Sequence, residues 1–320
     1  MEARFARVLF DSPAGELGAL GCQMASRDTM KKRHHFRPVL HLRHFANQSG
    51  LIWTYDRTGA AAPFQQSPNN IGYERLLYSP KEEGAKPDDA LENWFEVNVD
   101  RPAAEVLKRA IATDTLDNSD GSIVSRFIAA QDMRTPKVRD DLLDLFQMGM
   151  DQQFAQWRAD PGELRAAILR DTGEDISVDD LAAHLADTSV IVNNVAWFDF
   201  IVSQIDVAAR RLFAMGWSLL HAPAGIEFLT NDVGIVKCLG RIDRPCPFVL
   251  GFAAGRTHWV FPLSAEVAFA ILPTPGGVHG EASAMWVAAI NAQSIADAQR
   301  FVYSRTLLAD PWGEIHPLST

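Results

Sequence analysis

The chain has 320 residues, of which 47% are hydrophobic and 22% charged, with 21 Gly and 17 Pro. This composition is typical of a globular protein and excludes the collagen-like, disordered and coiled-coil classes. A formal charge of −10 argues against nucleic-acid binding over the whole surface, but it leaves room for a local basic site. The three cysteines lack CxxC spacing, which argues against a disulfide framework or a structural zinc site and favours a reducing compartment.

Targeting signals are weak along the whole chain. Asp11 and Glu16 interrupt the apolar stretch that a secretory signal needs. No stretch approaches the roughly 18 apolar residues of a membrane-spanning helix, so we expect a soluble, cytoplasmic protein that does not bind membranes. Residues 1–29 show no periodic apolar face, which predicts a poorly ordered leader. Three alternative translation starts are open, at Met1, Met24 and Met30.

The first two thirds of the chain predict a basic opening with a hairpin and then helices. Within residues 31–80, the segment 51–56 is rich in β formers and ends at Thr58-Gly59, which predicts a strand and its turn. Residues 102–215 carry helical periodicity, with Ser177 as the cap of one helix. The longest predicted helix covers residues 187–215. We expect it to be the central helix of a bundle, with Phe198 fully buried.

After residue 216 the period of the apolar residues changes. Short apolar or alternating runs lie between Gly, Pro and Asp, which predicts a small antiparallel sheet within residues 216–273. These runs are 217–220, 226–229, 234–238, 248–252, 258–261 and 267–271. A closing helix over 281–304 and a tail over 306–320 follow. The sequence therefore predicts an α+β fold, a predominantly helical bundle with an N-terminal β-hairpin and a small C-terminal sheet, in one domain over 31–305.

Several segments in chain order resemble one protein family. They are Lys32–Pro38 (KRHHFRP), Trp53–Asp56 (WTYD), Ser67–Gly72 (SPNNIG), Phe127–Gln131 (FIAAQ), Arg134–Pro136 (RTP), Phe228–Asp232 (FLTND), Phe261–Ser264 (FPLS) and Val302–Ser304 (VYS). Together they are similar to the family of the domain of unknown function 4238, over about residues 31–305. The resemblance implies an architecture and no reaction. His41 stands where the family usually has Tyr, so we expect no catalytic role for it, and Gly234 stands near a usual Pro, so the turn there is expected to differ.

The densest group of chemically active residues lies between Lys31 and His44, which holds four His and five Lys or Arg. Imidazoles titrate near neutrality, so His34 and His35 can serve as general acid, general base or metal ligands. Neighbours on an extended chain point in opposite directions, so at most one of the two faces a given pocket. The alternative is that one His hydrogen-bonds the core and the other is exposed.

Other polar residues lie at the ends of predicted elements. Arg134, beside the helix end that Pro136 imposes, can clamp a phosphate or instead tie the helix end to an acid. Gln131 shares its helix face. Asp232 can orient a His or hold a metal ion, although an Asx turn is the commoner use of such a residue. Asparagines such as Asn70 and Asn291 can position a substrate or satisfy backbone groups.

Two functions remain open from these residues. The first is a nuclease-like phosphodiester hydrolase that binds nucleic acid or another anionic ligand in a local basic cleft, with a divalent metal as an option. The second is a non-catalytic ligand-binding or protein-interaction module in which the same residues fasten helices to the sheet. The catalytic candidates are His34, His35, Arg134 and Asp232, and the substrate-binding candidates are Arg33, Asn70, Gln131 and Asn291. We expect at least one His to approach Arg134 or Asp232 in a common cleft. The lack of GxxxxGK[ST], HExxH and GxSxG motifs argues against three common enzyme classes.

Overall fold

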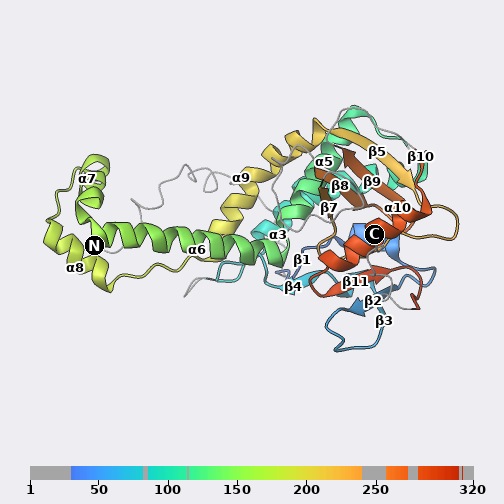
Figure 1. Cartoon of the computed structure of the whole chain (residues 1–320), viewed down its shortest axis with the longest axis horizontal. Coiled ribbons are helices and arrows are strands. Elements are labelled where there is room, and N and C mark those ends of the chain that lie inside the picture. Colours follow the sequence, from blue (N-terminus) through green and yellow to red (C-terminus); the bar gives the residue numbers. More distant parts are fainter. Residues whose placement is uncertain are drawn as a thin grey trace, which may run out of the picture. The chain divides into compact units, whose positions relative to one another are not determined.

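The computed structural model describes residues 30–81, 86–113, 115–239, 257–272, 280–309 and 312 (Figure 1). It is a mixed α/β protein, which confirms the expected class. The chain divides into two compact units. We call residues 140–199, with the short segment at 80–81, the helical unit, and the described parts of 31–79, 86–139 and 200–312 the main unit. The expectations for residues 1–29 and for a strand at 248–252 lie outside the described residues.

The helical unit has a small core of its own. It contains most of α6 (Pro136–Ala159), then α7 (Pro161–Thr172), α8 (Val178–Asp187) and the start of α9 (Asn194–Phe213). Its core consists of buried apolar side chains from α6, α7 and α8, namely Phe154, Leu164, Ile168, Leu181 and Leu185. Ser177 caps α8 as expected, because its hydroxyl accepts the Asp180 N–H at 3.1 Å.

The long helix predicted over 187–215 is shorter than expected, since α9 begins at Asn194. The side chain of Asn193 accepts the Val195 N–H at 2.9 Å, which is typical of a helix start. The preceding residues are held outside any helix, because Gln147 of α6 hydrogen-bonds the backbone on both sides of residue 191. The expectation of a fully buried Phe198 was wrong, since Phe198 is only partly buried and its neighbour Trp197 is the buried ring.

The main unit contains a five-stranded sheet in the order β10-β5-β9-β8-β7. Its strands are β5 (Gly216–His221), β7 (Val236–Leu239), β8 (Thr257–Pro262), β9 (Val267–Leu272) and β10 (Gly280–Glu281). The pairs are antiparallel except for the short parallel pair β10–β5. The sheet lies where the sequence predicts it, but the predicted run 226–229 forms no strand.

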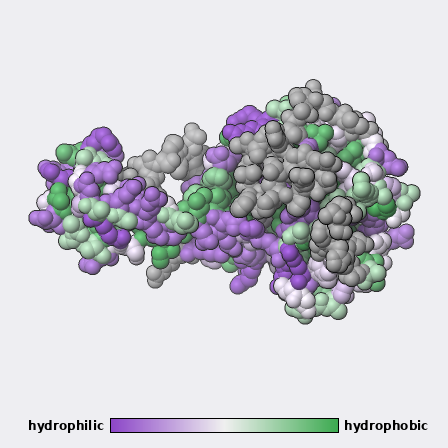
Figure 2. Space-filling model, in the orientation of Figure 1, coloured by the Kyte–Doolittle hydropathy of each residue, from purple (hydrophilic) through white to green (hydrophobic). Residues whose placement is uncertain are grey.

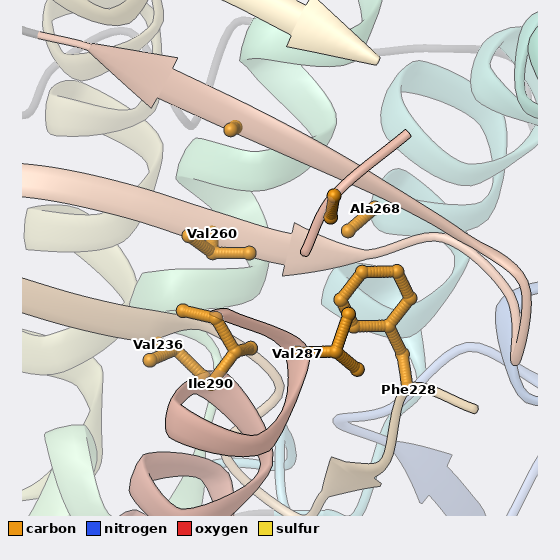
Figure 3. Packing of buried hydrophobic residues seen from close by; sticks show 8 residues of the cluster. Phe228, Val236, Val260, Ala268, Val287 and Ile290 are labelled. Atoms are coloured by element: carbon orange, nitrogen blue, oxygen red, sulfur yellow. The ribbon is translucent and has the colours of Figure 1, made fainter. Parts of the chain in front are cut away.

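Helices cover both faces of this sheet. On one face, Val287 and Ile290 of α10 (Ala284–Asp297) pack against Val236 and Val260 of the strands (Figure 3). Because successive strand residues point to opposite faces, Phe261 lies on the other face. There its ring meets that of Phe127 in α5 (Asn118–Met133), with centroids 5.9 Å apart.

A second sheet has the order β3-β2-β11-β6, with antiparallel pairs throughout. Its strands are β2 (Ile52–Asp56), β3 (Phe64–Gln66), β6 (Thr230–Asn231) and β11 (Phe301–Ser304). Strand β2 lies within the predicted strand 51–56, and it pairs with β3, for which the sequence analysis named no strand. The predicted closing helix is wrong after Asp297, because residues 301–304 are a strand. Asp232 is the reason, since its carboxylate accepts backbone N–H groups of residues 299–301 and turns the chain out of helix.

The remaining elements surround the N-terminal segment. Strands β1 (Arg33–His35) and β4 (Tyr73–Arg75) form an antiparallel two-stranded ribbon. The helices α2 (Val39–Leu42) and η2 (Arg43–Phe45) follow β1, and η3 (Pro68–Asn70) precedes β4. After β4 come α3 (Ala90–Phe95), the π-helix η4 (Glu96–Asp100) and α4 (Arg101–Thr113). No described helix has both the length and the apolar character needed to cross a membrane.

Candidate functional site

His34 is locked inside the main unit. Its Nδ1 accepts the backbone N–H of Tyr78 at 2.9 Å, and its Nε2 donates to the carbonyl of Lys31 at 3.1 Å. Both ring nitrogens are therefore used by the backbone, which fixes one neutral tautomer. Burial lowers the pKa of the ring and keeps it uncharged. The structure gives His34 the core hydrogen-bonding role that the sequence left open.

Arg134 is fully buried at the end of α5. Its Nη1 and Nη2 donate to the two carboxylate oxygens of Asp100 at 3.1 and 2.9 Å. The guanidinium also lies over the rings of Phe95 and Phe127, at 5.2 and 5.9 Å from their centroids. This bidentate pair ties the end of α5 to the π-helix η4, which is the structural alternative considered for this residue.

Asp232 and Asn291 both hold loops of the main unit. The Asp232 carboxylate accepts N–H groups of Gln299, Arg300 and Phe301 at 2.8, 2.8 and 2.9 Å. Asn291 accepts from the backbone N–H of Leu229 and donates to the backbone carbonyl of residue 227, each at 2.8 Å. Each side chain satisfies backbone groups that would otherwise be buried without partners.

A buried arginine that was not among the predicted site residues lies at the centre of the main unit. Arg37 is fully buried and donates through Nη2 to Thr230 Oγ1 at 3.1 Å and to His41 Nδ1 at 3.0 Å, and through Nη1 to Gln131 Oε1 at 3.4 Å. Burial, followed by the charge of Arg134, lowers its pKa to about 9, so it remains charged at neutral pH. We call Arg37, His41, Gln131 and Thr230 the central network.

His41 and Gln131 complete this network with backbone bonds. His41 Nε2 donates to the carbonyl of Pro262 at 2.7 Å, and Gln131 Nε2 donates to the carbonyl of Phe36 at 2.9 Å. The network thereby joins the N-terminal segment, α5 and both sheets. Gln131 thus binds the backbone and Arg37 inside the protein, rather than a group at the surface.

The two-stranded ribbon, by contrast, presents polar side chains at the surface. Its register places Arg33 opposite Arg75 and His35 opposite Tyr73. Paired residues and residues two apart share one face of a ribbon, so these four side chains lie on the same face. Both arginines are exposed, and the two rings are partly buried. We call Arg33, His35, Tyr73 and Arg75 the ribbon face.

Contacts within the ribbon face confirm that its side chains are neighbours. The Arg33 guanidinium lies 5.0 Å from the centroid of the Tyr73 ring, and the His35 ring lies 5.6 Å from it on a tilted plane. Arg33 Nη1 also donates to Asn70 Oδ1 at 3.0 Å. In the described part of the chain, no carboxylate forms an ion pair with Arg33 or Arg75. Two like charges directly opposite each other on a ribbon are destabilising by themselves.

His35 is a catalytic candidate with one ring nitrogen that forms no hydrogen bond to the described residues. Its Nε2 is buried and has no hydrogen-bond partner within the described residues. Burial lowers the pKa of the ring, and the charges of Arg134 and Arg33 lower it further, while the backbone of Asn69 raises it. The imidazole is therefore neutral at pH 7 and carries one nitrogen that can accept a proton or a hydrogen bond.

Glu92 of α3 lies directly behind His35. One of its carboxylate oxygens accepts the backbone N–H of His35 at 3.3 Å. Burial raises the pKa of this carboxyl to about 7, against the hydrogen bond from His35 and the charge of Arg134, which lower it. An acid that titrates near neutrality next to a neutral imidazole is a feature of sites that move protons.

Comparison with known proteins identifies a family for this chain. The protein family of unknown function DUF4238 matches residues 33–307. The chain belongs to the DUF4238 family. No curated protein and no solved structure matches it.

In this DUF4238 chain the candidate residues separate into two groups. Arg33, His35 and Asn70 come together at the ribbon, whereas the other candidates, His34, Arg134, Asp232, Gln131 and Asn291, hold the interior. No hydrogen bond joins any two of the four catalytic candidates within the described residues, although the charge of Arg134 acts on His35. In the same part of the chain, no three His, Cys, Asp or Glu side chains form a group that fits a metal ion.

A pH titration tests the environment of Glu92. Its folded-state pKa of about 7 exceeds its ordinary value of 4.5, so the stability that the protonated carboxyl contributes is present below about pH 4.5 and is lost as the pH rises through 7. We therefore expect Glu92→Gln to gain stability relative to the wild type between pH 5 and pH 8, by about 2–3 kcal/mol. Urea unfolding of both proteins at each pH measures this difference. A constant difference across the range would show that Glu92 titrates like an exposed carboxyl.

Proposed function

We propose that the chain binds single-stranded nucleic acid, or a short phosphate-bearing piece of it, on the ribbon face. The observation that carries the proposal is the register of β1 and β4, which sets Arg33 directly opposite Arg75 without an acidic partner among the described residues. A phosphate between the two guanidinium groups would offset their repulsion, and arginine is the side chain best suited to bidentate phosphate contacts.

The neighbouring rings favour a single strand over a duplex. Tyr73 is partly exposed between Arg33 and His35, so a base can stack on a ring that is already flanked by positive charge. A duplex hides the faces of its bases, so such a ring gains nothing from it. The chain's formal charge of −10 would confine nucleic acid to this local basic surface. We also propose that the protein binds nucleic acid in a reducing cytoplasm, because its three cysteines show no disulfide pattern.

Hydrolysis of the bound phosphodiester is the second candidate function, and the Nε2 of His35, unpartnered within the described residues, favours it. Once the ring turns so that its buried Nε2 meets the bound strand, the neutral imidazole can take the proton of a ribose hydroxyl or of a water molecule that attacks phosphorus. The imidazolium formed can then return a proton to the ribose oxygen that leaves as its bond to phosphorus breaks. Arg33 and Arg75 would then stabilise the charge that develops on the phosphate. In this proposal Arg134 acts only through its charge on His35. His34 holds the backbone of Lys31 and Tyr78, and Asp232 holds that of residues 299–301.

Removal of both ribbon arginines tests the binding. We expect Arg33→Ala combined with Arg75→Ala to weaken binding of a fluorescein-labelled single strand of roughly ten nucleotides by about 100-fold, or about tenfold for each arginine. The slope of log affinity against log salt should fall by about 0.7, because the one phosphate held between the two guanidinium groups is no longer neutralised. Fluorescence anisotropy at several salt concentrations measures both quantities.

The matched control carries the same change of charge elsewhere in the main unit. Arg210→Ala with Arg211→Ala removes two exposed arginines from the last turn of α9 and should leave the affinity unchanged. Equal losses in the two double variants would mean that binding follows net charge and not the ribbon face. Incubation of labelled RNA and DNA with and without Mg²⁺ tests the second function, in which His35→Gln should bind but not cleave.

A further inference from the structure

One segment of the helical unit, residues 140–199, has a formal charge equal to the net charge of the protein. Residues 140–199 include 13 Asp and Glu but three Lys and Arg, a formal charge of −10 that equals the charge of the full chain. The rest of the sequence is therefore neutral on balance. A charge of this size within 60 residues creates a strong local potential that repels anions and attracts cationic partners.

The same unit exposes large apolar side chains that its core does not need. Leu145 and Met148 of α6 are 59% and 68% exposed, and they lie three residues apart on one helix face. Ile191 is 85% exposed. We call these three residues the arm patch. Figure 2 shows apolar residues among the hydrophilic surface of this unit.

Specific bonds hold the segment around Ile191 to α6. Gln147 donates through Nε2 to the carbonyl of Val190 at 2.8 Å, and its Oε1 accepts the N–H of Val192 at 2.9 Å. These two bonds fix the backbone on both sides of Ile191 beside Gln147 of α6. Phe154 is the one buried residue that α6 contributes within the described residues, and Leu145 and Met148 remain exposed.

The charge decides which partner fits the arm patch. A second copy would bring two segments of charge −10 together, and nucleic acid or an anionic membrane would meet the same repulsion. A cationic partner gains from the potential and can also cover the apolar side chains. An exposed Met beside other apolar residues adapts to helices of varied sequence. We infer that the arm patch docks a basic amphipathic helix of another protein, with its apolar face on Leu145, Met148 and Ile191.

A synthetic peptide tests this docking on the full chain. The probe is a labelled amphipathic helix of Leu and Lys, of roughly 18 residues, long enough to be helical when bound. We expect it to bind with a Kd of about 10 μM or tighter, and Met148→Gln with Ile191→Ser to weaken binding at least about tenfold. A Leu and Glu peptide of the same pattern should not bind, and added salt should weaken the Lys peptide.

Three results of the peptide titration would overturn the inference. They are the absence of Lys-peptide binding up to about 1 mM, equal binding to a scrambled peptide of the same composition, and an unchanged affinity in the double variant. Met285→Gln provides the matched control, since this Met is 70% exposed on α10 in the main unit. Its affinity for the peptide should equal that of the wild type. Unchanged thermal unfolding of the double variant will show that lost docking is not lost folding. Sedimentation will show whether the arm patch instead pairs two copies of the chain, a result that would also overturn the inference.

Discussion

Replacement of Arg134 by Ala should lower the free energy of unfolding by about 3–5 kcal/mol, because Asp100 then keeps a partly buried charge without its partner. The ring contacts with Phe95 and Phe127 are lost as well. Urea unfolding followed by circular dichroism measures the change. A properly folded variant of wild-type stability that loses nucleic-acid binding would instead show that Arg134 serves the ligand directly.

A double variant distinguishes the effect of the unpaired Asp100 charge from the effect of the lost side-chain volume. Arg134→Met with Asp100→Leu removes both charges and keeps apolar volume, and such replacements of buried pairs are often neutral or stabilising. We therefore expect the double variant to be more stable than Arg134→Ala. If both variants are equally unstable, the packing of the aliphatic part of Arg134, and not its ion pair with Asp100, accounts for the lost stability.

Replacement of Gly234 by Ala should destabilise the protein by about 3 kcal/mol or more. Gly234 has a φ of +89°, and a Cβ atom there would lie 1.5 Å from Nη1 of Arg37. Arg37 is fully buried and fastened by Thr230, His41 and Gln131, so it has nowhere to move. Overpacking of this kind typically costs about 1–3 kcal/mol, and the strained backbone adds about 1 kcal/mol.

A second glycine separates the two causes. Gly50 also has a positive φ, of +73°, but a Cβ atom added there would meet no described atom within 4 Å. Gly50→Ala should therefore show the backbone term alone, at about 1 kcal/mol. Urea midpoints of the two variants give the comparison. Equal losses would mean that Arg37 yields to the new methyl group and that the central network is not rigid.

Local signals in the sequence were sufficient for the elements that depend on local chemistry. The cap at Ser177 and the strand ending at Asp56 lie where propensity and turn residues place them. The errors arose where residues distant in sequence determine the secondary structure of a segment. Gln147 holds the segment before α9 out of helix, and Asp232 turns the chain into β11, and neither effect has a signature at the segment that it changes.

The candidate site was predictable in its residue types but not in its geometry. Arg33, His35 and Asn70 come from the basic opening and the following loop, which the sequence singled out. Arg75 was missed, because its position opposite Arg33 depends on the register of two strands that lie about 40 residues apart.

Arg37 was missed for a different reason. It was only counted among the five Lys or Arg of the basic opening, although two glycines, Gly72 and Gly234, leave the space that its side chain fills. The segments that resemble the family meet at this central network, which receives Arg37, Gln131, Thr230 and the carbonyl of Pro262 from four of them. Those segments therefore specify the core of the main unit at least as much as its surface.

The ring of His35 offers the most direct test of the ribbon face as the binding surface. NMR spectra of the full chain labelled in its histidines, with His34→Gln and His35→Gln to assign the signals, will report each ring as a short single-stranded oligonucleotide is added. The account predicts that the His35 resonances shift in proportion to binding, since its Nε2 has no partner in the described part of the chain, while those of His34 stay fixed by their two backbone bonds. Binding that leaves His35 unchanged, or that moves His34 instead, would contradict it.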